Sequence, residues 1–419
     1  MATTGGFVLG AGMRFGTILV LGLAGSVMAA AGDAPQRFFK GNTHAHSLWS
    51  DGNDFPEMIM DYYHRNGYDF AVLSDHNTFA EGYRWKSVRD IKRLQKVDGP
   101  GAIEKCEARF GPDWIEWEEH EGERGVVLKT LAEYRGQFEA PGEFLIIKAE
   151  EISDKSSGGP VHINALNLER LVTPVGGDKI STVTVMRQLL RTVAEQEEEI
   201  GRPILAHLNH PNYKWVVTPQ DLAAVVEERF FEVYNGHPGV NHLGSAEIPG
   251  DEMMWDIANT MRVGKMGEAP LFGVATDDSH YYHGGDISPG RGWVMVEADA
   301  LSSNSLIKAM RAGDFYASSG VVLSRMHYDA ESRVIELEIE ADGDARFSSA
   351  LIGTRTHQAD SPERIGEVLA RSSGRKVRFE VPADALYARV TITSSAEHSN
   401  PSYDHQRKQA WTQPVGWRQ

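Results

Sequence analysis

Two histidines, His44 and His46, are separated by one residue and follow the apolar segment that begins at Phe38. Side chains at positions i and i+2 of an extended strand point to the same face, so these imidazoles should lie side by side. Asp51 follows the expected strand, where a loop can bring its carboxylate back toward them. Imidazole together with carboxylate suits zinc, manganese or iron. This segment is therefore a candidate metal site.

Further histidine and acidic residues recur where other strand-like segments end. A metal site at the mouth of a barrel requires this arrangement, because it draws one or two ligands from each of several strands. Random placement would scatter histidines over loops and helix faces. The residues collected from the strand ends are His44, His46, Asp51, Asp75, His76, Glu151, His162, either His207 or His210, Asp278 and His280.

The elements that must position these residues alternate between strands and helices up to about residue 322. Continuous apolar runs predict buried strands, and periodic apolar positions predict amphipathic helices. The expected strands cover residues 38–44, 70–74, 144–151, 161–166, 203–208, 230–235, 271–276 and 292–296, and the clearest helices cover 54–66, 182–200 and 303–311. This order predicts an α/β, barrel-like domain with its chemistry at the carboxyl ends of the strands. Residues near 80–140 are charged and aromatic, and we expect a mostly helical insertion that could cover the site.

The composition changes after residue 322. Residues 333–340 alternate strictly between apolar and polar, and 376–381 and 387–392 do the same. This pattern predicts a small antiparallel β-sandwich, with residues 409–414 as its candidate last strand. The predicted domains are therefore an α/β domain over residues 32–322 and a β-sandwich over 323–419.

The first 31 residues have the pattern of a secretory signal peptide. Arg14 precedes the apolar segment 15–25, and small residues follow at 28–31. An uncleaved membrane anchor is the alternative, but the apolar segment is short and rich in glycine. We therefore expect a secreted or periplasmic protein with no membrane attachment after cleavage.

Composition limits the chemistry further. The chain of 419 residues carries a formal net charge of -17, which argues against a nucleic-acid partner because phosphate backbones need clustered cations. Cys106 is the single cysteine, so an intramolecular disulfide and a cysteine-based zinc site are both excluded. The sequence contains no phosphate-binding or dinucleotide-binding glycine motif, so ATP or NAD use is not indicated. Oligomeric state is not indicated either.

In five short motifs, in order, the chain resembles the PHP (polymerase and histidinol phosphatase) metallohydrolases. These are HxHxxxSDG at 44–52, SDHN at 74–77, Glu151-Ile152-Ser153, His210-Pro211 and Asp278-Ser279-His280. The resemblance covers roughly residues 38–320. A weaker likeness, to exported members grouped with carbaryl (carbamate) hydrolases, rests on residues 40–44, 276–280 and 410–414.

The resemblance implies a distorted (β/α)7 barrel that holds two or three divalent ions, of zinc, manganese or iron. The ligands it implies are His44, His46, Asp51, His76, Glu151, His162, His210, Asp278 and His280.

Some positions depart from the family pattern or compete with a ligand. Asn42-Thr43 stands where the family often has Asp-Leu, and Ala149 replaces a usual glycine. Glu150 competes with Glu151. The HP motif favours His210 over His207, and the DxH spacing favours Asp278 over Asp277.

The activity that these features favour is a metal-dependent phosphoesterase acting on a phosphomonoester or a small phosphodiester. A metal-bound hydroxide at a di- or trinuclear site would attack phosphorus, with Glu151 or Asp278 as a bridging ligand. Asp75 would orient a ligand histidine or accept a proton, and Arg291 would bind phosphoryl oxygens. Weaker cation candidates are Lys148, His242 and His283. The alternatives are a carbamate, ester or amide hydrolase on the same metals, and a non-catalytic binding protein.

Overall fold

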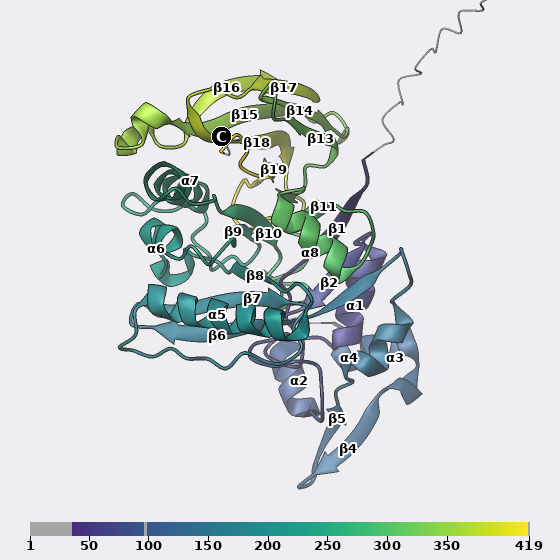
Figure 1. The fold of residues 1–419 in the computed structure, drawn as a ribbon. Helices are drawn as coiled ribbons and strands as arrows, with labels where there is room; N and C mark the ends of the chain where they lie inside the picture. The colour runs from purple at the N-terminus through teal and green to yellow at the C-terminus, as the bar shows by residue number, and fades with distance from the viewer. Residues whose placement is uncertain (1–35, 96–98, 418–419) are drawn as a thin grey trace, which may run out of the picture. The chain divides into compact units, whose positions relative to one another are not determined.

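The computed structural model describes residues 36–95 and 99–417 (Figure 1). The predicted signal peptide lies outside these residues. No helix in the described ranges combines the length and the apolar character needed to span a membrane. Residues from Pro35 to Gln419 belong to one unit.

The described residues form a mixed α/β structure around one large sheet of thirteen strands. Its first nine strands along the chain are β1 (Phe38–Asn42), β2 (Phe70–Leu73), β6 (Leu145–Ser156), β7 (Gly159–Leu166), β8 (Leu205–Leu208), β9 (Phe230–Asn235), β10 (Phe272–Thr276), β11 (Trp293–Glu297) and β12 (Phe315–Ser318). Strands β1, β2 and β6 are parallel neighbours, as are β8, β9 and β10, while β7 runs antiparallel between the two groups. Every residue of β2, β9 and β10 is buried, which explains why these strands are mostly apolar.

Helices connect most of these strands, as the alternating pattern predicts. They are α1 (Pro56–Arg65), α5 (Thr182–Ile200), α6 (Pro219–Ala224), α7 (Asp251–Met261) and α8 (Ser303–Ala312). The longest, α5, begins after Ser181, whose side chain accepts a hydrogen bond from the Thr184 N–H. It ends at Gly201, whose φ of 64° is a left-handed conformation that suits glycine. Its buried stripe includes Val185 and Leu189.

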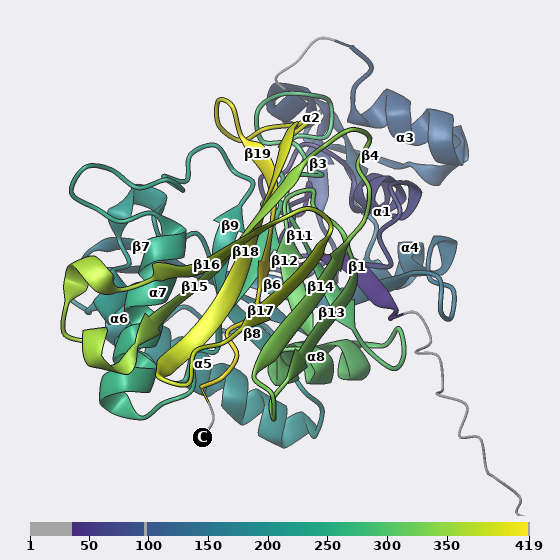
Figure 2. The ribbon, with the colours of Figure 1, turned by 90° about the horizontal axis from the view of Figure 1, so that it is seen from above.

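The insertion near residues 80–140 is less helical than its sequence predicts. It contains α2 (Val88–Gln95), α3 (Ala102–Phe110) and α4 (Leu131–Tyr134), but also a three-stranded sheet of β3 (Trp85–Ser87), β5 (Glu123–Val127) and β4 (Glu116–His120). Strand β4 has the sequence Glu-Trp-Glu-Glu-His. With only one apolar residue, it lacks the alternation of apolar and polar residues that would indicate a strand. Figures 1 and 2 both place the insertion beside α1.

The described residues after 322 form seven strands, four of which the alternation predicts, and two short 3₁₀ helices, Thr356–Gln358 and Pro362–Arg364. Strands β13 (Leu323–Asp329), β14 (Val334–Ile339) and β17 (Lys376–Glu380) form a separate sheet, whereas β15 (Phe347–Arg355), β16 (Glu367–Ser373), β18 (Ala385–Glu397) and β19 (Arg407–Thr412) extend the large one. Strand β19 pairs with both β12 and β18, so the C-terminal strands continue the sheet of the preceding α/β part (Figure 2). Leu337 and Phe379 of the small sheet share an apolar cluster with Leu351 and Val390 of the large one.

A buried ion pair also links the two parts. Arg389 of β18 lies within 2.7 Å of an Asp256 carboxylate oxygen on α7, and both side chains are almost fully buried. Asp256 and Glu252 hold the pKa of Arg389 above its usual value in spite of its burial. Such a pair fixes register between elements even where its net contribution to stability is small.

Candidate metal centre

The segment that carries His44 and His46 continues β1 beyond its last strand residue. Strand β1 ends at Asn42, and the histidines follow in a segment that pairs with the one around Ser279. The His46 N–H donates to the Ser279 carbonyl at 2.9 Å, and the Asp278 N–H donates to the His44 carbonyl at 3.0 Å. The imidazole centroids are 5.1 Å apart. The two rings are thus neighbours, as predicted, and they adjoin the Asp278–His280 motif.

Glu151 of β6 lies at the centre of the histidines. One of its carboxylate oxygens, Oε1, is 2.9 Å from His162 Nδ1, and the other, Oε2, is 2.6 Å from His76 Nδ1. Longer contacts of 3.4–3.5 Å join the carboxylate to His44, His46 and His210. Burial opposes its ionisation, but His76 and His162 hold the pKa of Glu151 well below its usual value. Glu151 is therefore an ionised, buried carboxylate, as a bridging ligand requires.

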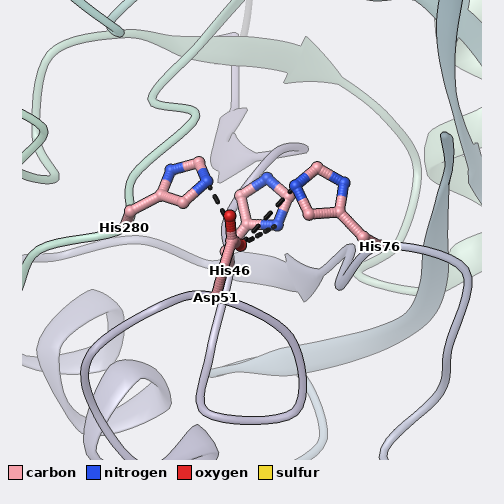
Figure 3. Close-up of side chains that lie close together, drawn as sticks. All are labelled: His46, Asp51, His76 and His280. Atoms are coloured by element: carbon pink, nitrogen blue, oxygen red, sulfur yellow. Dashed lines mark ion pairs between the residues drawn. The ribbon is translucent and has the colours of Figure 1, made fainter. Parts of the chain in front are cut away.

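Two aspartates complete the cluster from other directions. Asp278 Oδ1 lies 3.2 Å from Nε2 of both His44 and His46. Asp51 Oδ1 lies 3.4 Å from His280 Nε2 and 3.5 Å from His76 Nε2 (Figure 3). The Asp51 side chain is half exposed, whereas Asp278 is buried. Asp51 therefore marks the solvent side of the cluster.

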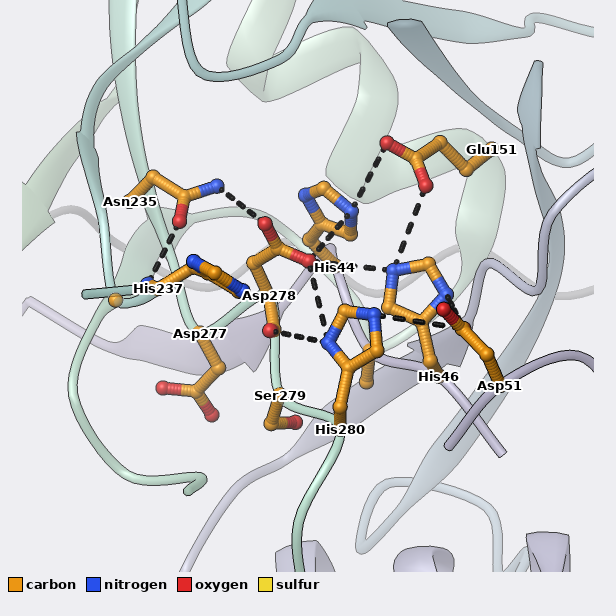
Figure 4. A network of polar contacts seen from close by, with 12 residues as sticks. His44, His46, Asp51, Glu151, Asn235, His237, Asp277, Asp278, Ser279 and His280 are labelled. Atoms are coloured by element: carbon orange, nitrogen blue, oxygen red, sulfur yellow. Dashed lines mark hydrogen bonds and ion pairs between the residues drawn. The ribbon is translucent and has the colours of Figure 1, made fainter. Parts of the chain in front are cut away.

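The ligand atoms form three overlapping groups, and within each the atoms lie within 4.8 Å of one another. The groups are His46, Asp51, His76 and His280; His44, His46 and Asp278; and His76, Glu151 and His162. His210 adjoins them through its contact with Glu151. The structure thus brings all nine sequence-predicted ligands into one cluster, much of which Figure 4 shows.

Several buried atoms of this cluster lack hydrogen-bond partners among the described residues. They are His44 Nε2, both ring nitrogens of His46 and Glu151 Oε2. Buried polar atoms are rarely left unpaired, and an unpaired set that points at a common centre is what a missing ion explains. Burial and the neighbouring His280 and His76 lower the pKa of His46 to about 3, so its imidazole is neutral and can coordinate. The donor set therefore fits divalent metal ions.

The tertiary structure shows which residue of each competing pair, His207 or His210 and Asp277 or Asp278, faces the cluster. His207 is buried, with its Nδ1 3.8 Å from Glu232 Oε1, whereas His210 contacts Glu151. Asp277 accepts hydrogen bonds from the backbone of residues 290–292, whereas Asp278 faces the histidines. His210 and Asp278 adopt positive φ angles of 25° and 47°. Such strained conformations at strand ends turn side chains in directions that strand alternation does not predict.

Arg291 does not join the cluster, which corrects its predicted role in phosphate binding. Its side chain is buried, and its guanidinium donates to the carbonyls of Gly236 and Asp286 and to Asn400 Oδ1. Its backbone N–H is held by Asp277. Arg291 therefore anchors the loop before β11, and four of its five guanidinium N–H groups already donate to acceptors in the protein.

Asp75 also differs from its predicted role. Its carboxylate is buried and accepts hydrogen bonds from Ser47 N–H, Ser47 Oγ and Ser50 Oγ. No contact with a ligand histidine is found for it among the described residues. Asp75 instead holds the turn that carries Asp51, so it positions a ligand through the backbone rather than through an imidazole.

The weaker cation candidates likewise have other partners. Lys148 pairs with Glu81, His242 with Asp251, and His283 lies beside Lys105 and Asp54.

Another carboxylate, that of Glu232, supports the ligands through hydrogen bonds, and it belongs to none of the motifs. Glu232 of β9 accepts from His44 Nδ1 at 2.7 Å and from Thr276 Oγ1 at 2.8 Å through one oxygen. Its other oxygen accepts from the His210 N–H and from Asn235 Nδ2, each at 2.7 Å. An acidic residue inside an otherwise apolar buried strand is the one sequence signal that could have revealed it.

Amide side chains form a further supporting layer. Asn209 Nδ2 donates to Glu151 Oε1 at 2.8 Å and to Asn164 Oδ1 at 2.9 Å. Asn164 in turn donates to the Thr43 carbonyl at 2.8 Å. These bonds hold Glu151 against the segment of the first histidine pair, and ligand orientation by such outer contacts is a general feature of metal sites.

Glu150, the neighbour of Glu151, faces the other side of β6 and provides a prediction about stability. Its Oε2 accepts from the Val172 N–H at 3.0 Å, and burial raises the pKa of Glu150 to about 7. Because the folded state binds this proton more tightly, the group should lower the free energy of unfolding as pH rises from about 4.5 to about 7. Glu150→Gln should raise the free energy of unfolding by up to about 3 kcal/mol at pH 8 and change it little at pH 4.5. Urea unfolding of both proteins at the two pH values measures this, and a pH-independent difference would contradict it.

No protein-family model and no curated protein matches this chain. Solved structures that are similar to it include two from bacteria. One, from Bacteroides vulgatus, is described as a two-domain protein containing a predicted PHP-like metal-dependent phosphoesterase; it is 15% identical, with a TM-score of 0.35, over 91% of this chain and 96% of that one. The other, from Bifidobacterium adolescentis, is described as a candidate metal-dependent phosphoesterase; it is 11% identical, with a TM-score of 0.28, over 58% and 88%. The first description names a PHP-like phosphoesterase, the second names no family, and neither mentions carbamate hydrolysis. Because both TM-scores are below 0.5, neither similarity establishes an activity for this chain.

Proposed function

We propose that this chain is a PHP-type metallohydrolase that hydrolyses a phosphomonoester or a small phosphodiester. The convergence of nine histidine and carboxylate ligands from several strands and the segments that follow them, with unpaired buried nitrogens among them, carries this proposal. In this proposal the α/β part is the distorted (β/α)7 barrel, and the strands after residue 322 form the β-sandwich. A secreted or periplasmic location belongs to the same proposal.

Divalent ions held in the cluster would supply Lewis-acid activation of water and substrate. The role of the protein is to hold their ligands in place. Glu151 stands between the histidine groups and is kept ionised by them. Glu232 fixes the ring of His44 so that Nε2 faces the cluster, and Asp75 holds the turn of Asp51. Three carboxylates, on Asp51, Glu151 and Asp278, would offset part of the charge of two or three divalent ions.

A second candidate, hydrolysis of a carbamate, ester or amide on the same centre, is favoured by one observation. In the described ranges, no lysine or arginine forms an ion pair with Asp51, Glu151 or Asp278, whose ion-pair partners are all histidines. A dianionic phosphomonoester usually meets cations besides its metal ions, whereas a neutral carbonyl substrate does not need them.

Metal content and substrate preference test the proposal together. Purified protein should contain at least two divalent ions per chain and hydrolyse bis-p-nitrophenyl phosphate or p-nitrophenyl phosphate with zinc, manganese or iron. Turnover of 1-naphthyl methylcarbamate alone would replace the proposal with the second candidate. Bound metal with no turnover on a broad panel would indicate a binding protein, and absence of metal would refute the site.

A further inference from the structure

A histidine outside every motif borders the metal cluster. His237 follows β9, and its ring centroid lies 5.8 Å from that of His280 in an edge-to-face arrangement. Figure 4 shows it beside Asp278, on the side of Asn235. Tyr213 packs edge-on against His237 at 6.2 Å and against the ligand His210 at 5.1 Å. His237 and Tyr213 thus form one wall at the cluster.

The loop that carries His237 is anchored to a ligand. Asn235 Oδ1 accepts from the His237 N–H at 2.8 Å, while Asn235 Nδ2 donates to Asp278 Oδ2 at 3.1 Å. Gly236 lies so close to the Asp277 segment that a Cβ would stand 2.6 Å from the Asp277 carbonyl oxygen. Glycine is therefore required there, and the close approach places His237 next to Asp278.

The hydrogen bonding of the ring decides which of its nitrogens can donate. The Gly239 N–H donates to His237 Nδ1 at 2.8 Å, so Nδ1 acts as an acceptor and carries no hydrogen. In the neutral ring the hydrogen must then be on Nε2. Among the described residues, no hydrogen-bond partner is found for this Nε2–H. A donor of fixed tautomer is thus held at the edge of the cluster without an acceptor among residues 36–95 and 99–417.

We propose that His237 is a substrate-contact residue that donates its Nε2–H to a phosphoryl oxygen of the ester. This inference rests on the proposed phosphoesterase function and deepens it. Negative charge on the phosphoryl oxygens must be matched by donors or cations, and Arg291 is already occupied. A neutral hydrogen-bond donor already in position beside the cluster would bind a phosphoryl oxygen without placing a positively charged side chain close to bound metal ions.

Two variants separate the donor from the ring's structural role. His237→Asn keeps an acceptor near the position of Nδ1 for the Gly239 N–H but removes the donor at Nε2. His237→Gln places an amide N–H near the position of Nε2. For protein reconstituted with manganese, we expect His237→Asn to lower kcat/KM for the preferred p-nitrophenyl phosphate ester about 100-fold. His237→Gln should recover at least about tenfold of this loss.

Two further readouts do not depend on turnover. Elemental analysis should give the same manganese content for the wild-type protein and both variants. The inhibition or dissociation constant of inorganic phosphate should rise about tenfold in His237→Asn and stay near the wild-type value in His237→Gln.

The outcomes distinguish this inference from the proposed function. An active wild-type protein with unchanged kinetics in His237→Asn would overturn the inference alone, as would equal losses in both variants. Loss of manganese from His237→Asn would assign the residue to the support of the metal site instead. A metal-loaded wild-type protein that neither hydrolyses phosphate esters nor binds phosphate would overturn the proposed function, and the inference with it.

Discussion

Replacing Glu151 with glutamine is expected to lower metal content by at least one ion per chain and to lower kcat roughly a thousandfold or more. Glu151 is 1% exposed and lies within 3.5 Å of nitrogens on five histidines. A neutral amide cannot bridge two cations, and its NH2 group would face nitrogens that should face metal. Elemental analysis and turnover of the preferred ester measure the two effects.

Glu150→Gln is the matched control for this experiment. The two residues are adjacent on β6, but Glu150 faces away from the cluster and binds the Val172 N–H. Its replacement should leave metal content and turnover unchanged at neutral pH. A fully metallated and active Glu151→Gln protein would refute the site. Loss of metal from Glu150→Gln would show that metal binding depends on the integrity of β6 rather than on the Glu151 carboxylate.

Replacing Glu232 with glutamine is expected to weaken metal binding about 10–100-fold while leaving every ligand in place. Glu232 is fully buried and all its recorded contacts are donors, namely His44 Nδ1, Thr276 Oγ1, the His210 N–H and Asn235 Nδ2. An amide NH2 at either position would meet a donor. The ring of His44 would then lose its orientation, and the loop of His210 would lose its anchor.

Competition with a chelating dye measures this affinity, and Glu228→Gln serves as the control. Glu228 is equally buried and precedes the same strand, but it accepts from the N–H groups of Arg229 and Phe230 and does not contact the cluster. Burial raises the pKa of Glu228 to about 8, so a neutral glutamine is a close replacement. Equal metal affinities in the two variants would show that Glu232 has no special role in orienting His44.

The sequence by itself predicts those features that depend on residues close together in the chain. A separation of two residues places His44 and His46 side by side, and continuous apolar runs mark the buried strands. The alternation after residue 322 predicts four of the seven strands found there for the same reason. Seven of the nine ligands follow the end of a strand, whereas Glu151 and His162 lie within β6 and β7, and short motifs carry most of the residue types and their spacing. These features depend on neighbours within a few residues, so they survive in the sequence as patterns.

Tertiary structure alone decided which side chains face one another across those strand ends. Positive φ angles at His210 and Asp278 set directions that alternation does not give. Arg291 is excluded from the cluster by partners more than 50 positions away, at Gly236 and Asn400. Glu232 supports a histidine 188 positions earlier, so no local pattern could indicate it. Spacing along the chain therefore predicts the ligand types, whereas long-range contacts determine their support and exclude the false candidates.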